Sequence, residues 1–139
     1  EVSSGNYINI RTSYIGPTLG DDAEELFDWF LSQSHDVFGY NHSFWNGVTT
    51  LELAISIDKL IELNFCGTYH LTGKTVLSKY DLLLLIARIY NKNIRIIPDD
   101  KIKINRSLDS TKFKNLTKFR FKNWYQMISE MKEKKNVEK

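Results

Sequence analysis

The segment from Tyr80 to Tyr90 constrains the fold more than any other part of the sequence, because it has a helical pattern and is apolar on nearly every side. Ser78 precedes it, and Asp81, three residues later, completes a pattern similar to a capping box. We expect such a helix to be largely buried, so other elements must cover most of its surface. The sequence therefore predicts a packed core around this helix.

Short β-rich runs and helical patterns alternate along the rest of the chain. Strands are expected over 7–15, 37–40, 67–73 and 94–97, and helices are expected to start near Asp21 and to span 50–63, 110–116 and 121–134. The remainder of 32–46 has the composition of a loop. In the helix over 50–63, the residues expected on the apolar face are Leu51, Ala54, Ile55, Ile57, Leu60 and Ile61. The alternation predicts an α/β fold.

Composition indicates one globular region followed by a short tail. The chain has 139 residues, of which 42% are hydrophobic and 13% aromatic, enough apolar mass for one core. We therefore expect one globular region over 1–132 and a charged, solvated tail over 133–139. The net charge is only +2, which gives no general attraction to nucleic acid or to an anionic membrane.

Cysteine usage and hydropathy indicate the cellular compartment of the protein. Cys66 is the single cysteine, so it cannot form an internal disulfide, and we expect it to be a small buried hydrophobic residue in a reducing environment. No apolar run approaches the roughly 18 residues of a membrane span, and no signal-peptide pattern is present. These features predict a cytoplasmic protein without membrane contact.

Several catalytic and cofactor motifs are absent from the sequence. The seven glycines do not match a dinucleotide-binding or phosphate-binding loop, and no tyrosine is followed by a lysine four residues later. No zinc-protease motif or cysteine cluster is present, and we expect His35, His42 and His70 to be ordinary polar residues. We therefore assign no catalytic residue and no metal ligand to this chain.

Four parts of the sequence, in order, resemble the C-terminal part of an extended short-chain dehydrogenase/reductase. The similarity is to sugar-nucleotide reductases of the dTDP-4-dehydrorhamnose reductase type. The matching stretches are IRTSYIGP at 10–17, NGVTTLELA at 46–54, GTYHLTG at 67–73 with SKYDL at 78–82, and RSLDSTKF at 106–113. Each motif alone is weak, but together they cover nearly the whole chain in the order of that family.

The resemblance implies an α/β fold that forms the C-terminal substrate-binding portion of an extended short-chain reductase. It would contain the last central strand plus helices and short strands, with the N-terminal Rossmann half absent. The intact enzyme would pass hydride from NAD(P)H to a 4-keto sugar nucleotide, in the synthesis of cell-surface polysaccharide precursors, while a tyrosine donates the proton. NAD(P) would be bound mainly by the absent half, and none is expected to bind this chain alone.

The same resemblance assigns binding residues. In the family, the end of the strand with the Arg-Thr-Ser motif passes the nicotinamide, so Thr12, Ser13 and Tyr14 are assigned to the cofactor. The alternative is that these residues complete a buried strand, with Arg11 paired to a carboxylate.

The substrate would be a UDP- or dTDP-sugar, and the residues assigned to it are Trp45, Asn46 and Arg106. Aromatic rings stack on a base or sugar, amides donate to hydroxyls, and a guanidinium matches phosphate oxygens. The alternatives are that Trp45 is a core anchor and that Arg106 forms a structural salt bridge. Asp109 is expected to cap the helix over 110–116.

Two other classes of function remain open at this stage. The chain could be a stand-alone binding or scaffold module of the same fold without the chemistry. A weaker reading is nucleic-acid binding by a basic stretch with interleaved phenylalanines, consisting of Lys112, Phe113, Lys114, Lys118, Phe119, Arg120, Phe121 and Lys122. Because the first strand would lack its parallel neighbours, we also expect the chain to aggregate or to self-associate as a homo-oligomer.

Overall fold

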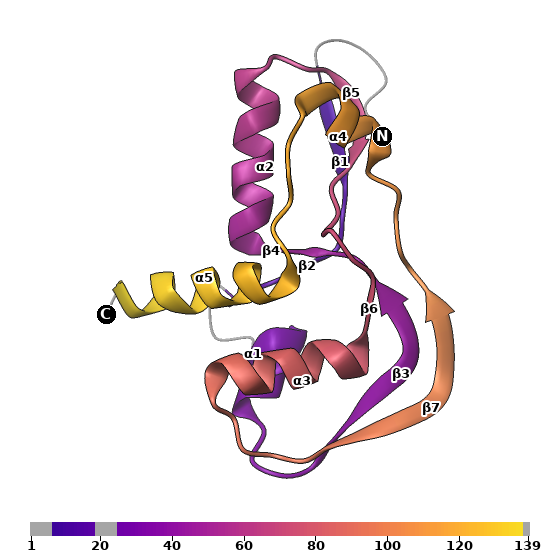
Figure 1. Ribbon diagram of the computed structural model, residues 1–139, viewed down its shortest axis with the longest axis vertical. Helices are drawn as coiled ribbons and strands as arrows, with labels where there is room; N and C mark the ends of the chain where they lie inside the picture. Colours follow the sequence, from indigo (N-terminus) through magenta and orange to yellow (C-terminus); the bar gives the residue numbers. More distant parts are fainter. Residues whose placement is uncertain (1–6, 19–24, 138–139) are drawn as a thin grey trace.

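The computed structural model describes residues 7–18 and 25–137 and confirms the mixed α/β class (Figure 1). The strands are β1 (Ile8–Arg11), β2 (Tyr14–Ile15), β3 (Val37–Trp45), β4 (Val48–Thr49), β5 (Gly67–His70), β6 (Leu77–Ser78) and β7 (Ile96–Asn105). The helices are α1 (Leu26–Ser32), α2 (Thr50–Glu62), α3 (Lys79–Tyr90), α4 (Thr111–Thr117) and α5 (Trp124–Val137). The expected helix start near Asp21 lies outside the described residues.

Of two short parallel pairs, β1 with β5 lies at one end of the molecule together with α2 and α4, and β2 with β4 lies near its middle (Figure 1). β1 pairs with β5 from Ile8↔Gly67 onward, and β2 pairs with β4. The expected continuous strand over 7–15 is therefore divided, with Thr12 and Ser13 between the two parts. The division arises because β1 and β2 pair with different strands.

A three-stranded sheet in the order β6-β3-β7 forms the other end. β3 is nine residues long, so the expectation of a short strand within a loop is wrong. Its burial alternates along most of its length, as in a strand with one covered face. β7 runs through Pro98, where the sequence predicted an end, and a proline is tolerated there because β7 is an edge strand of this sheet.

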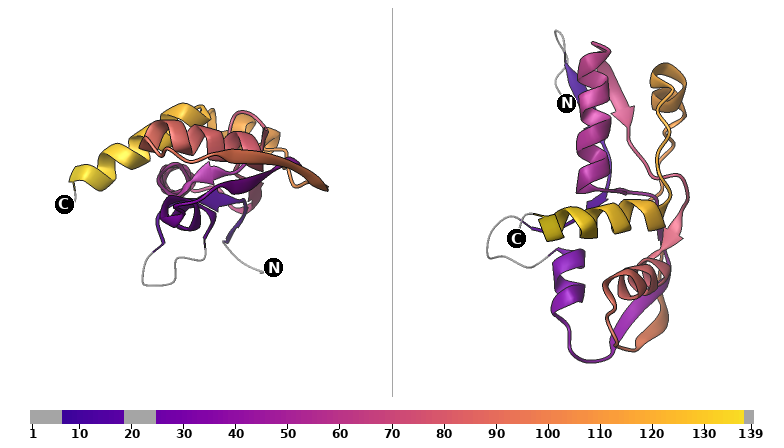
Figure 2. Two further views of the ribbon diagram at one scale, coloured as in Figure 1. Left: turned by 90° about the horizontal axis from the view of Figure 1, so that it is seen from below. Right: turned by 60° about the vertical axis from the view of Figure 1, so that its left-hand side comes forward.

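The core lies where α3 packs against β3 and α5 lies beside α3 (Figure 2). The buried residues of these two helices are Leu82, Leu83, Ile86, Ile89, Trp124, Met127, Ile128 and Met131. The predicted burial of α3 is confirmed for this face, whereas Leu84 on the other side is 42% exposed. The first turn of α3 has the predicted cap, since the Ser78 hydroxyl accepts a hydrogen bond from the Asp81 amide at 3.0 Å.

The face that α2 buries differs from the apolar face expected from the sequence. Its fully buried residues are Glu52, Ser56 and Leu60, whereas Ile55 is 40% and Ile61 62% exposed. The reason is that Glu52 is turned inward, where it accepts a hydrogen bond from the Lys122 amide. Helical spacing alone did not predict a buried carboxylate.

The C-terminal region also differs from the expectation. α5 begins three residues later than predicted and continues to Val137, so the expected boundary between 132 and 133 falls inside this helix. Residues 138–139 lie outside the described part. Cys66 is exposed rather than buried. Within 7–18 and 25–137, no helix is both long and apolar enough to cross a membrane.

Candidate functional site

A cavity of about 790 Å³ opens beside the three-stranded sheet, between α1, α3 and the end of β7. Its lining residues are Leu26, Trp29, Gln33, Asp36, Val37, Phe38, Gly39, Tyr40, Ser43, Lys79, Leu83, Ile102, Ile104 and Arg106. Aromatic and aliphatic walls with a few polar groups are typical of a small-molecule site of this size. Two cations, Lys79 and Arg106, belong to this lining.

Gly39 determines how closely α3 approaches the sheet at this cavity. A Cβ atom built on Gly39 would lie 2.9 Å from the Cα atom of Tyr80, closer than side chains are observed to pack. Glycine therefore allows the start of α3, with Lys79, to lie directly against β3.

The register of the sheet places the two cations on opposite sides of β3, close to the level of Phe44. Phe44 on β3 pairs with Ser78 on one side and with Asn105 on the other. Lys79 and Arg106 are the residues that follow these two partners in sequence. The Arg106 amide continues the pairing, because it donates to the Phe44 carbonyl oxygen at 2.9 Å.

Lys79 is partly buried and lies close to a second cation, Arg106. Its Nζ atom lies 4.4 Å from the centre of the Trp45 ring, in cation–π geometry. Burial lowers the pKa of Lys79, and the nearby Arg106 charge lowers the pKa further, while Glu25 acts in the opposite direction. Among the described residues, the side chains of Lys79 and Arg106 form no ion pair and no hydrogen bond.

The three residues assigned to the substrate have different surroundings. Arg106 lines the cavity, but Trp45 is only 3% exposed and its ring lies 5.1 Å from that of Trp124. Asn46 donates to the Leu108 carbonyl oxygen at 2.8 Å and accepts from the Leu108 amide at 2.9 Å. Trp45 therefore lies beneath Lys79, as a core residue, and Asn46 anchors the segment that follows Arg106.

The residues assigned to the cofactor lie together at the carboxyl end of β1. The Thr12 hydroxyl donates to the Leu71 carbonyl oxygen at 2.7 Å, and the Ser13 carbonyl oxygen accepts from the Val48 amide at 2.9 Å. Ser13 and Tyr14 are exposed. None of the three lines the cavity.

These residues lie at a position where open α/β sheets commonly bind ligands. Ligands of open α/β sheets bind at the carboxyl ends of the parallel strands, which is where β1 and β5 end here. Exposed Ser13 and Tyr14 are available for contact, but the sequence has no glycine-rich loop to hold a pyrophosphate.

The expectation that Asp109 caps α4 is wrong by one position, because Asp109 lies one residue before the N-cap. Its Oδ1 atom accepts from the Thr111 amide at 2.8 Å, at the start of α4. The hydrogen bonds from Thr111 lower the pKa of Asp109. The residue at the N-cap position is Ser110, whose hydroxyl instead accepts from Thr72 at 2.7 Å.

The three histidines have separate partners. His35 bonds to Ser34, His42 lies 3.4 Å from Asp100, and His70 bonds to the Asp109 carbonyl oxygen. In the described residues, no group of three or more histidine, cysteine or acidic side chains is arranged to hold a metal.

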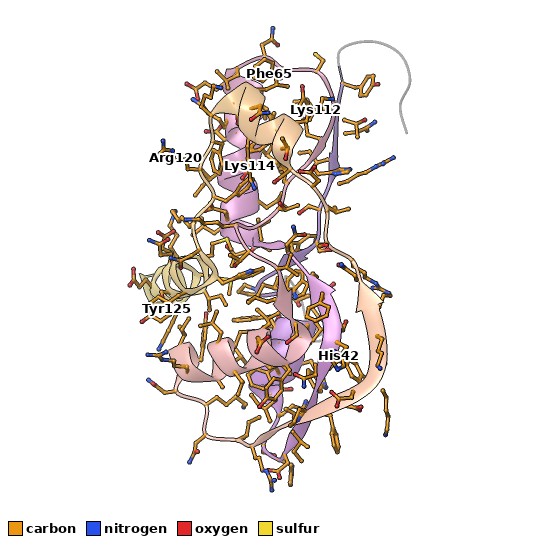
Figure 3. All side chains as sticks on the ribbon, turned by 45° about the vertical axis from the view of Figure 1, so that its right-hand side comes forward. His42, Phe65, Lys112, Lys114, Arg120 and Tyr125 are labelled. Carbon is orange, nitrogen blue, oxygen red and sulfur yellow. The ribbon has the colours of Figure 1, made fainter. Side chains whose placement is uncertain are left out.

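Several side chains of the basic stretch contact other parts of the protein. Lys112 donates to the Thr68 carbonyl oxygen at 2.9 Å, and Lys122 pairs with Glu130 and Glu52. Phe113 and Phe121 of the same stretch are buried. Figure 3 shows Lys112, Lys114 and Arg120 on and after α4, at the end of the molecule away from His42. These contacts favour a structural role for the stretch over a nucleic-acid surface.

Sequence reasoning missed three residues of the cavity, namely Trp29, Tyr40 and Lys79. Trp29 lay in the helix expected to start near Asp21, and Tyr40 lay in the short strand expected over 37–40. Lys79 stood within a matched motif, next to the Ser78 cap. The missed signal was that a lysine directly after a strand-to-helix cap lies near the end of the neighbouring strands.

Comparison with solved structures identifies the fold. The chain aligns with a dTDP-4-dehydrorhamnose reductase from Clostridium acetobutylicum at a TM-score of 0.77 and 20% identity, over 94% of this chain and 49% of that one. An enzyme of the same name from Bacillus anthracis, in complex with NADP, also gives 0.77, at 15% identity and the same coverage.

Related sugar-nucleotide enzymes align less closely. A UDP-N-acetylglucosamine 4-epimerase from Methanobrevibacter ruminantium, in complex with UDP-N-acetylmuramic acid, gives a TM-score of 0.70 at 12% identity, over 96% of this chain and 47% of that one. No family model matches the sequence, and no curated protein is significantly similar to it. The chain spans about half the length of the solved structures that it matches. It has the mixed α/β fold of about half of a dTDP-4-dehydrorhamnose reductase.

Proposed function

We propose that this chain is the nucleotide-sugar-binding part of an NAD(P)-dependent reductase that acts on 4-keto sugar nucleotides. The observation that carries the proposal is the cavity, which combines aromatic walls with Arg106 in a chain that shares its fold with such reductases. The NADP complex of the Bacillus anthracis reductase and the sugar-nucleotide complex of the epimerase support the two ligand classes.

The residues of the chain have distinct roles in this proposal. Trp29 and Tyr40 offer flat faces to a base or sugar ring, and Arg106 offers its guanidinium to a phosphate. Asn46 keeps the Arg106 segment in place through its two hydrogen bonds to Leu108. These groups bind and orient the UDP- or dTDP-sugar, so they contribute specificity rather than acid–base chemistry.

The remaining chemistry belongs to a second polypeptide half with a Rossmann fold. When bound mainly by that half, NAD(P) would supply the hydride, and a tyrosine of that half would donate the proton. Thr12, Ser13 and Tyr14 would contact the nicotinamide side of the cofactor from the end of β1. The product would enter the synthesis of a cell-surface polysaccharide precursor in the cytoplasm.

Isothermal titration of the 139-residue chain with UDP- and dTDP-sugars tests this function. We expect saturable binding that Arg106→Ala weakens about tenfold or more, since a charge-assisted contact to phosphate is lost. Arg120→Ala is the matched control, because Arg120 is an exposed arginine that does not line the cavity. Absence of binding to any sugar nucleotide, with or without an added Rossmann half, would contradict the proposal.

The second candidate is a binding or scaffold module without chemistry. The exposed apolar residues of α2, Ile55 and Ile61, favour it, because they offer a surface for a protein partner. This reading requires a protein partner in pull-down experiments and no thermal shift with sugar nucleotides.

A further inference from the structure

Two cations that form no ion pair with the described residues line one cavity, and this arrangement requires an explanation. Lys79 and Arg106 follow the residues that flank Phe44 on either side, so two strand spacings, about 10 Å, separate their backbones across the sheet. Because β6 runs antiparallel and β7 parallel to β3, the two backbones are also offset along β3 by about two residues, which brings their separation to about 12 Å. Both side chains line the same cavity, and the charge of Arg106 acts on Lys79. Long side chains that start this far apart can contact one ligand from two sides.

The carboxylates nearby do not neutralise this pair. Asp36 lines the same cavity, but the described structure contains no ion pair between it and either cation. Glu25 favours the charged form of Lys79, yet burial and Arg106 outweigh it. An anionic ligand between the two cations would remove their mutual repulsion.

Trp45 determines where the Lys79 ammonium lies. The indole ring is held in the core against Trp124, and its face carries the ammonium at 4.4 Å. Lysine has a flexible stem that a ligand site must hold in place. A fixed aromatic face beneath the ammonium restrains it at low cost, because the ring itself cannot move.

We propose that Lys79 is a second phosphate-binding residue of this cavity, that Trp45 positions it, and that Lys79 and Arg106 together select ligands with two linked phosphates. The inference rests on the function proposed above and adds to it the diphosphate as the recognised group. A diphosphate presents oxygens to both cations at once, whereas a monophosphate satisfies one of them.

Titration of the full 139-residue chain with UDP, UMP and inorganic pyrophosphate tests the proposal. We expect UDP to bind at least tenfold more tightly than UMP. Lys79→Met should weaken UDP binding about tenfold and leave UMP binding less affected. Lys101→Met is the matched control, since it removes the same charge from an exposed lysine of β7 outside the cavity lining.

The positioning role of Trp45 is tested by a measurement that would not change if Trp45 had a purely structural role. We expect UDP to raise the pKa of Lys79, because a bound anion stabilises the ammonium. NMR of the Lys79 side chain at a series of pH values measures this pKa. Trp45→Leu should reduce UDP affinity several-fold, and Trp45→Phe should restore most of it, since a phenyl face also holds a cation. Circular dichroism verifies that both variants are folded.

Each outcome has a distinct meaning. If UDP binds the wild-type chain and Lys79→Met has no effect, the inference is overturned and the proposed function stands. If pyrophosphate binds through Lys79 and Arg106 while no sugar nucleotide binds, the diphosphate site stands and the proposed function fails. If neither UDP nor pyrophosphate shifts the Lys79 signals, the inference is overturned.

Discussion

Single residues of this chain show how polar groups are accommodated in its core. Glu52 is 2% exposed, and its carboxylate accepts from the Lys122 amide at 3.1 Å and pairs with the Lys122 ammonium at 3.6 Å. It thereby joins the first turn of α2 to the segment before α5. A buried carboxylate is tolerated here because both kinds of partner are present.

Replacing Glu52 with Gln should destabilise the fold by about 1–3 kcal/mol, since the buried group loses a charged partner and part of its hydrogen bonding. Chemical denaturation measures this change. Glu62→Gln is the control, because Glu62 forms an exposed pair with Lys59 and such pairs contribute little. Equal midpoints for the two variants would show that Glu52 does not join the elements as described.

Tyr90 predicts a dependence of stability on alkaline pH. Burial, and secondarily the charge of Asp28, raises the pKa of Tyr90 from 10.0 to about 12. In the unfolded chain the phenol ionises near pH 10, whereas in the folded chain it stays neutral until about pH 12. The stabilising contribution is therefore complete below pH 10 and is lost as the pH rises from 10 to 12.

The Tyr90→Phe variant isolates this effect. Its stability should fall less steeply between pH 10 and 12 than that of the wild-type chain, as measured by thermal unfolding at each pH. At neutral pH the variant should be as stable as the wild type or more stable, because the Tyr90 hydroxyl is buried without a hydrogen-bond partner in the described structure. A parallel pH profile for both chains would contradict the assignment.

Among the elements, the helices were more predictable than the long strands. Helical spacing, and for α3 also the cap at Ser78, predicted the bounds of α2 and α3 to within one residue. β3 and β7 were not predicted at full length, because Asn41, His42 and Pro98 are typical of loops. Their strand conformation comes from pairing with each other, and pairing between distant segments leaves no local pattern.

The close packing of α3 on β3 gives a prediction at Gly39. Gly39→Ala should destabilise the fold by about 1–3 kcal/mol, because the added methyl group meets the backbone of Tyr80 rather than a flexible side chain. It should also weaken ligand binding, since it displaces the start of α3 and with it Lys79. Denaturation and titration measure the two effects, and a variant with unchanged midpoint and unchanged affinity would contradict this close packing.

For the molecule as a whole, the order of the resembling motifs predicted the fold that comparison identified. The candidate site was predicted less completely. Arg106 lines the cavity, whereas Trp45 and Asn46 lie behind it, because sequence alone did not distinguish a residue that contacts a ligand from one that supports it. Lys79 became apparent only when the sheet register was known.

The open surfaces predict self-association of the isolated chain. In the described residues β1 pairs with β5 alone, and Ile55 and Ile61 expose apolar area on α2. Light scattering at high concentration should detect oligomers or aggregates. Replacing both isoleucines with Glu should reduce association, whereas Leu84→Glu on the exposed side of α3 should not. A monomer at every concentration would contradict this prediction.

The parallel pairing of β3 with β7 has a consequence for synthesis of the chain. The cavity needs a wall from β3 and a wall from β7, and residues 46–95 lie between these strands. Contacts between distant segments form slowly because a long loop must close first. During translation, β3 therefore leaves the ribosome well before its partner, and the ligand site forms only after Arg106 has been made.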